Sequence, residues 1–285
     1  MYKLWSSLLG LILTSSAINV GAQGINYSVS NLWSIGTGAG RAYVTSGNTE
    51  RGGSYNPINN HAYIVSRAVG VKVAILHGDT GAEVGFLNVA GVTGGTFALS
   101  TISVAEDGTI YGANLTTGSA TSPYKIYKWT NETSAPLVIY SANPSGGANN
   151  NRYGDCAIDV RGSGLDTEII TVAQNNPLLA LFRPSDAFLT NFISTRLDIT
   201  GVPNLQDLTK GIAFGIGNTI YGKNNGGTPV RYCSYNPTTG TGAYVSSYTI
   251  ASQAEIDVDP VRKLLAAADC ANNTTDHTLR VYDLS

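Results

Sequence analysis

A pattern of paired strands recurs five times along the chain and constrains its fold more than any other feature. Each copy has a short apolar strand, a polar loop, a second strand and a turn rich in Gly, Asn, Asp or Pro. The clearest copies are 109–114 with 124–129, and 219–224 with 230–235. Successive copies are separated by about 45 to 60 residues. This interval is typical of four-stranded β-propeller blades, whereas a β-sandwich has shorter intervals between its repeating strands.

The sequence therefore predicts an all-β chain with one β-propeller domain over residues 23–285, built from five four-stranded blades. The fifth copy stops at residues 281–285, before a fourth strand. An apolar segment near the N-terminus is expected to supply that strand and close the ring within the molecule. The alternative is that it completes the last blade of a neighbouring molecule, which would build a polymer by strand addition. The side chains of this closing or assembly strand are Val29, Leu32, Trp33 and Ile35.

The first 22 residues have the features of a secretory signal peptide. Lys3 gives a positive start, residues 8–13 form a short apolar core, and residues 20–22 are small or apolar, as a cleavage site requires. We expect the mature chain to begin near Gln23 and to be secreted, either extracellular or at the cell surface. No other segment approaches the length of a membrane-spanning helix, so we expect no membrane span in the mature chain.

Charge and cysteine content narrow the functional classes. Only 13% of the residues are charged and the formal net charge is -2, so the chain lacks the basic surface that nucleic-acid binding requires. The three cysteines, Cys156, Cys233 and Cys270, leave at least one thiol unpaired within the chain. We interpret all three as small buried residues.

No motif indicates a cofactor, a metal site or a catalytic group. His61, His77 and His277 are widely spaced along the sequence and match no metal-binding motif. Nucleophile and phosphate-loop motifs do not occur either. We therefore expect no cofactor, no metal and no assigned catalytic residue, and an enzymatic role is disfavoured but open.

Several segments resemble an uncharacterised family of secreted bacterial propeller-like proteins, described as a domain of unknown function. The resemblance lies in residues 85–99, 105–117, 151–155, 159–164 and 279–285. It implies an exported, propeller-like protein and transfers no catalytic residue. Members of that family tend to continue beyond the closing Tyr-Asp-Leu-Ser stretch, so the chain is expected to be either a short relative or an incomplete one.

The starts of the innermost strands supply the candidate ligand site, because propellers bind ligands over their central channel. Aligning the five copies places Arg51, Ser100, Asp155, Lys210 and Glu255 at one mouth of this channel. Four of the five are charged and could hold a polar ligand such as a sugar, or an ion. Alternatively, the charges pair with one another and plug the channel, and such pairs contribute little to stability.

Acidic residues on two inner strands give weaker signals. Glu255, Asp257 and Asp259 alternate with apolar residues and share one face of a strand, but they are too widely spaced to bind one calcium ion unaided. Pairs of carboxylates for glycoside chemistry could come from Asp155, Asp159, Glu255 and Asp257. No motif singles out such a pair.

Two functions remain open at this stage. The first is a secreted, non-catalytic scaffold that self-associates or binds an extracellular matrix or glycan, with strand addition as one route to a polymer. The alternative is a carbohydrate-binding or carbohydrate-active module that uses the charged mouth of the channel. A propeller fold supports both and does not choose between them.

Overall fold

The computed structural model shows an all-β fold, in which the only helices of the described residues are two short 3-10 turns, η1 (Gly164–Asp166) and η2 (Leu205–Leu208). It describes residues 17–19, 26–28, 30–37, 40–47, 49–155, 158–174, 178–224, 228–250, 255–268 and 279–284. Most of the predicted signal peptide lies outside these ranges. The all-β prediction is confirmed.

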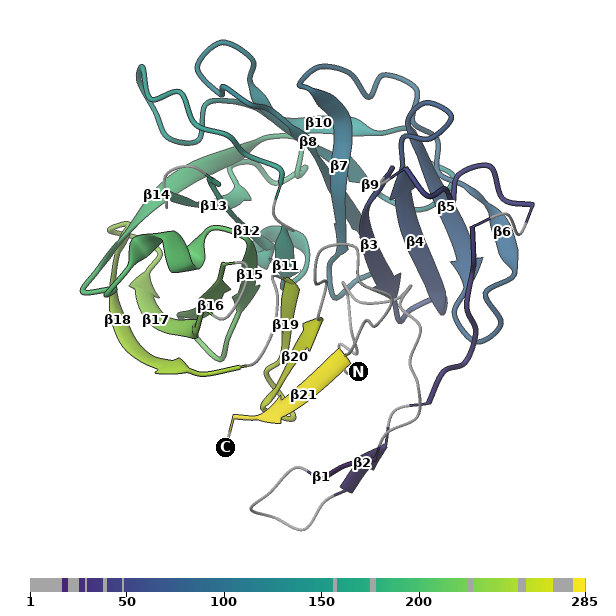
Figure 1. Cartoon of the computed structure of the whole chain (residues 1–285). Helices are drawn as coiled ribbons and strands as arrows, with labels where there is room; N and C mark the ends of the chain where they lie inside the picture. Colours follow the sequence, from purple (N-terminus) through teal and green to yellow (C-terminus); the bar gives the residue numbers. More distant parts are fainter. Residues whose placement is uncertain are drawn as a thin grey trace.

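The strands are grouped in chain order into antiparallel sheets (Figure 1). A short hairpin, β1 (Ala17–Asn19) and β2 (Asn26–Ser28), precedes two four-stranded sheets. The first of these contains β3 (Glu50–Asn56), β4 (His61–Ser66), β5 (Lys72–His77) and β6 (Glu83–Phe86). The second contains β7 (Phe97–Val104), β8 (Ile110–Leu115), β9 (Tyr124–Trp129) and β10 (Leu137–Ala142).

The next eight strands form one continuous sheet, in which two antiparallel groups are joined by a parallel pairing of β14 with β18. One group is β11 (Asp159–Arg161), β12 (Glu168–Val172), β13 (Leu179–Pro184) and β14 (Phe192–Thr200). The other is β15 (Gly211–Phe214), β16 (Thr219–Lys223), β17 (Val230–Asn236) and β18 (Thr241–Tyr248). The last sheet has three strands in the described part of the chain: β19 (Glu255–Asp259), β20 (Leu264–Ala268) and β21 (Leu279–Asp283).

The first strand of each group lies toward the middle of the molecule. Figure 1 shows β3, β7, β11, β15 and β19 there. Contacts join β3 with β7, β7 with β11, β11 with β15, and β15 with β19. This order places the residues at the starts of these strands near one another.

Apolar packing between consecutive groups forms the core. Trp129 and Leu99 belong to a cluster between the first two sheets, and Tyr124 packs with Phe182 between the second sheet and the β11–β14 group. Further clusters fill the next two spaces. Every residue of β8 is buried, because apolar clusters cover both of its faces: Tyr111 and Ala113 belong to one cluster and Ile110 to another. This explains why the central strands read as short continuous apolar runs.

The N-terminal segment departs from its predicted role. Residues 30–36 form no strand, and Trp33 and Ile35 pack on the apolar face of the first sheet that is turned away from the second. The Trp33 indole Nε1 donates a 2.6 Å hydrogen bond to the Gly78 carbonyl oxygen. Leu32 is exposed, and Val29 lies outside the described residues. The described part of this segment therefore does not complete the last sheet, and the expectation that Leu32, Trp33 and Ile35 close the ring is wrong.

Two local features explain this outcome. The face of the first sheet that carries Ala62 and Leu76 is apolar and needs cover from another part of the chain. Gly81 provides room for the Trp33 ring, because a Cβ at this position would lie 2.6 Å from the ring. Gly81 also has a φ of +65°, which favours glycine. Covering this face fixes the segment on the first sheet.

Cys233 is buried and unpaired, as predicted, and burial raises the pKa of its thiol to about 12. Cys156 and Cys270 lie outside the described residues. The described part of the chain has no helix with the length and apolar character that a membrane crossing requires.

A buried ion pair between Asp207 in η2 and Arg231 in β17 of the eight-stranded sheet gives a test of the fold. Asp207 Oδ2 accepts hydrogen bonds from Arg231 Nε and Nη2 at 2.9 and 2.6 Å, and both side chains are buried. Asp207→Ala should lower the free energy of unfolding by about 3–5 kcal/mol, because it leaves a buried guanidinium without its carboxylate. Asp198→Ala, which breaks the exposed pair with Arg196 in the same sheet, should cost only about 0–1 kcal/mol. Urea denaturation measures both, and equal losses would contradict the prediction.

Candidate functional site

The predicted mouth residues come from four different strand groups. Arg51 is the second residue of β3, Asp155 lies in the loop before β11, Lys210 directly precedes β15, and Glu255 begins β19. Ser100 is buried within β7 and its backbone lies against Gly52, next to Arg51. The hydrogen-bonded ladders of the inner strands position these side chains at one end of the molecule.

Arg51 and Asp155 form an ion pair between two strand groups. Arg51 Nη2 lies 3.6 Å from Asp155 Oδ1, and the Asp155 side chain is only 6% exposed. Arg152 also binds Asp155, donating from Nη2 to Oδ1 at 2.8 Å and from Nε to Oδ2. Both carboxylate oxygens of Asp155 therefore face guanidinium groups.

Glu255 interacts electrostatically with the same cluster. Burial raises the pKa of its carboxyl group to about 7, while Lys210 and Arg51 act in the opposite direction. The pKa of Arg51 is lowered, mainly by burial and also by Arg67 and Arg152, although Asp155 and Glu255 oppose the shift. The structure thus brings Arg51, Asp155, Lys210 and Glu255 into one electrostatically coupled cluster, which we call the charged mouth. Its role in ligand binding stays a prediction.

A second feature lies at the opposite ends of the inner strands. A cavity of about 270 Å³ has a wall of carboxylates from Glu106, Asp159, Asp257 and Asp259. Its apolar lining includes Phe214. The four acids considered for glycoside chemistry are therefore divided between two places: Asp159 and Asp257 line this cavity, whereas Asp155 and Glu255 belong to the charged mouth.

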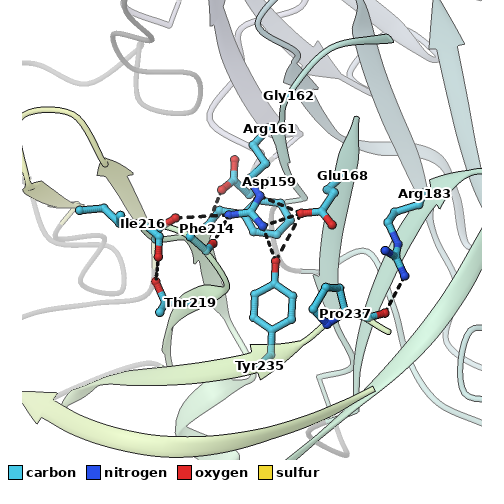
Figure 2. Close-up of polar contacts among 12 residues, drawn as sticks. Asp159, Arg161, Gly162, Glu168, Arg183, Phe214, Ile216, Thr219, Tyr235 and Pro237 are labelled. Carbon is cyan, nitrogen blue, oxygen red and sulfur yellow. Dashed lines mark hydrogen bonds and ion pairs between the residues drawn. The ribbon is translucent and has the colours of Figure 1, made fainter. Parts of the chain in front are cut away.

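Arg161 lines this cavity, and Figure 2 shows its polar contacts. Its Nε and Nη2 donate to Glu168 Oε2 at 2.8 and 2.5 Å, and Nη2 also donates to the Tyr235 hydroxyl at 2.6 Å. The guanidinium carbon lies 4.4 Å from the centre of the Phe214 ring. Because this arginine is already bound by protein groups on several sides, it fixes the ends of β11, β12, β15 and β17 and is poorly placed to bind a ligand.

The cavity carboxylates are also engaged by the backbone. Asp159 accepts two backbone hydrogen bonds of 2.7 Å, from Phe214 N to Oδ2 and from Val160 N to Oδ1. Asp159 and Phe214 are both drawn in Figure 2. Asp257 Oδ1 accepts a hydrogen bond from Val258 N. Sequence reasoning singled out Asp159 and Asp257 but missed Arg161, Phe214 and Tyr235. No spacing in the sequence indicates these three, since they come from three separate strands.

His61 and His77 are closer together than the sequence suggested, whereas His277 lies outside the described residues. His61 and His77 are directly opposite each other on β4 and β5, with ring centres 6.4 Å apart. The two residues are far apart in the sequence but adjacent in space, because β4 and β5 are antiparallel neighbours. His61 Nδ1 lies 2.7 Å from Glu132 Oε1. Even so, no group of three or more His, Cys, Asp or Glu side chains within the described ranges is arranged to hold a metal ion.

Comparison with known proteins gives a family and a fold. The model of the DUF4623 family, described as a domain of unknown function, matches residues 47–284. A crystal structure of a DUF4623 family protein from Bacteroides eggerthii is similar over 99% of this chain and 68% of that chain, with a TM-score of 0.61 and 18% identity. The β-propeller domain of Cps50 (Swd1) from Myceliophteria thermophila is similar over 85% of this chain and 72% of that chain, with a TM-score of 0.51 and 15% identity. No curated protein matches the chain. At these identities the likeness to solved structures establishes a propeller-like fold and no activity.

The pKa of Glu255 gives a test of the charged mouth. In the folded protein its carboxyl group keeps a proton up to about pH 7, whereas in the unfolded chain it loses the proton near pH 4.5. The contribution of Glu255 to stability is therefore greatest below about pH 4.5 and is lost as the pH rises to about 7. Glu255→Gln should remove this part of the pH dependence, as measured by urea unfolding across that range. An NMR titration of Glu255 that shows an ordinary glutamate pKa would contradict the prediction.

Proposed function

This chain belongs to the DUF4623 family, and from the geometry of its charged mouth we propose that it is a secreted, non-catalytic protein that binds a carbohydrate. The observation that carries the proposal is the convergence of Arg51, Asp155, Lys210 and Glu255 from four strand groups. Charged side chains held at the end of a rigid set of strands can bind the hydroxyl groups of a sugar without rearrangement. The signal-peptide features of residues 1–22 support an extracellular location.

The contacts of Asp155 favour binding over catalysis. Glycoside hydrolysis needs two carboxyl groups free to exchange a proton or attack the sugar. Asp155 is bound on both oxygens by arginine side chains, so it is poorly placed for either role. Glu255 alone, even with a raised pKa, supplies one half of such a pair.

The proposal includes a finer description of the fold. We take β3–β6, β7–β10, β11–β14, β15–β18 and β19–β21 as five blades around a central channel, with the charged mouth at one end. The adjacency of the first strands supports this description, as do the clusters of apolar side chains between consecutive groups. The propeller-like structural relatives support it as well.

A glycan screen with matched variants tests carbohydrate binding. The wild-type protein should retain at least one class of glycan, and Lys210→Ala should weaken that binding at least tenfold by removing a donor from the mouth. Arg196→Ala, on the exposed side of β14, should leave binding unchanged. Loss of binding in both variants to the same extent, or no binding to any glycan by the wild type, would contradict the proposal.

A second candidate function is self-association through the last sheet. This sheet has three described strands where the others have four in each group, and β21 pairs with β20 alone among the described strands. An unpaired strand edge exposes N–H and C=O groups that can pair with a strand from another molecule. A second copy of the chain, or a matrix component with an extended segment, would fit this edge.

Light scattering after size-exclusion chromatography tests self-association. If the edge of β21 pairs between molecules, the mass of the mature chain should rise with protein concentration, because association follows mass action. A mass that stays that of a monomer at every concentration would contradict this second candidate. The result does not bear on carbohydrate binding.

A further inference from the structure

Arg51 is a charged group of the mouth whose hydrogen-bonding capacity the described residues leave unfilled. It makes no hydrogen bond to any residue that the structure describes, and its Nε is buried without an acceptor. Its nearest carboxylate oxygen, on Asp155, is 3.6 Å away, which is too long for a hydrogen bond. A guanidinium has five N–H donors in a planar fork, and leaving them unpaired away from water is unfavourable. Among the described residues, the site therefore lacks a hydrogen-bond acceptor for the N–H groups of Arg51.

The neighbouring acids do not supply it. Asp155 is held by two hydrogen bonds from Arg152. Glu255 is largely protonated below pH 7 because of its burial. Glu50, the residue before Arg51, already accepts hydrogen bonds from Thr45 N and Thr49 Oγ1.

Further positive charge lies near Arg51. Arg67 and Arg152 act on Arg51, and Lys210 acts on Glu255. Arg51 and Arg67 also share the Phe97 ring, with guanidinium carbons 5.1 and 4.0 Å from its centre. The ring holds two like charges close together, which is favourable only if an anion lies near them or water screens them.

We propose that the charged mouth binds an oxyanion carried by the ligand, a carboxylate or a sulfate ester of an acidic glycan, with Arg51 as the principal contact. The planar fork of Arg51 can donate two parallel hydrogen bonds to such a group. This inference rests on the proposed carbohydrate-binding function and adds the charge of the ligand. It identifies Arg51 as the residue that determines specificity and Phe97 as a positioning residue.

Calorimetric titration with paired ligands tests the inference. The probes are an oligomer of galacturonic acid, its neutral methyl ester, a sulfated galactan and the unsulfated galactan. At least one anionic member should bind at least tenfold more tightly than its neutral partner, and which one does so distinguishes carboxylate from sulfate. This comparison uses the unchanged protein, so it does not depend on the folding of any variant.

Variants then assign the effect to Arg51. Arg51→Ala should remove the preference for the anionic glycan, and Arg51→Lys, which keeps the charge but loses the fork, should keep part of it. Arg196→Ala is the matched control and should retain the full preference. Thermal unfolding of each variant confirms that the protein is folded.

The outcomes separate this inference from the function on which it rests. Equal binding of the charged and neutral glycans would overturn the oxyanion inference and leave carbohydrate binding standing. An anionic preference that Arg51→Ala leaves intact in a folded protein would also overturn it. Failure of all four glycans to bind would overturn the oxyanion inference, and the broader glycan screen then decides whether carbohydrate binding itself stands.

Discussion

The rest of the structure depends on one constraint: the apolar side chains of each group of strands must be buried against the next group. The clusters around Trp129, Phe182 and Leu181 each join one group of strands to the next. Burial of such large apolar side chains contributes about 1.5–3 kcal/mol each. This packing fixes the directions of the inner strands, and the inner strands in turn set where the charged side chains at their ends can lie.

Polar groups in this chain are concentrated where that packing ends. Arg51, Asp155, Lys210 and Glu255 lie at or just before the starts of inner strands. Asp159, Arg161 and Asp257 lie further along these strands and line the cavity. The two ends differ in how completely their charges are paired. Arg161 is bound by Glu168, Tyr235 and backbone carbonyls and acts as a structural clamp, whereas Arg51 has no hydrogen-bond partner in the described residues. This difference is why the mouth, and not the cavity, carries the proposed binding site.

The N-terminal segment shows how tertiary packing overrides a plausible local interpretation. Its apolar residues fit a closing strand, but they equally fit a cover for an apolar sheet face. The first sheet presents such a face around Ala62 and Leu76, and Gly81 leaves space for the Trp33 ring. A hydrogen bond from Trp33 to the Gly78 carbonyl then fixes the segment there. The position of the N-terminal segment is therefore decided by the apolar sheet face that is available to it.

The sequence by itself determined the all-β class, the positions of most strands and the alignment that brings Arg51, Asp155, Lys210 and Glu255 together. These follow from local patterns, because apolar runs and turn residues at regular intervals specify strands and their order. Only the tertiary structure decided where Trp33 packs, that His61 faces His77, that Arg161 clamps the cavity and that Arg51 lacks an acceptor. Each of these depends on contacts between different strands or on the burial of a single atom, and such contacts leave no periodic trace in the sequence.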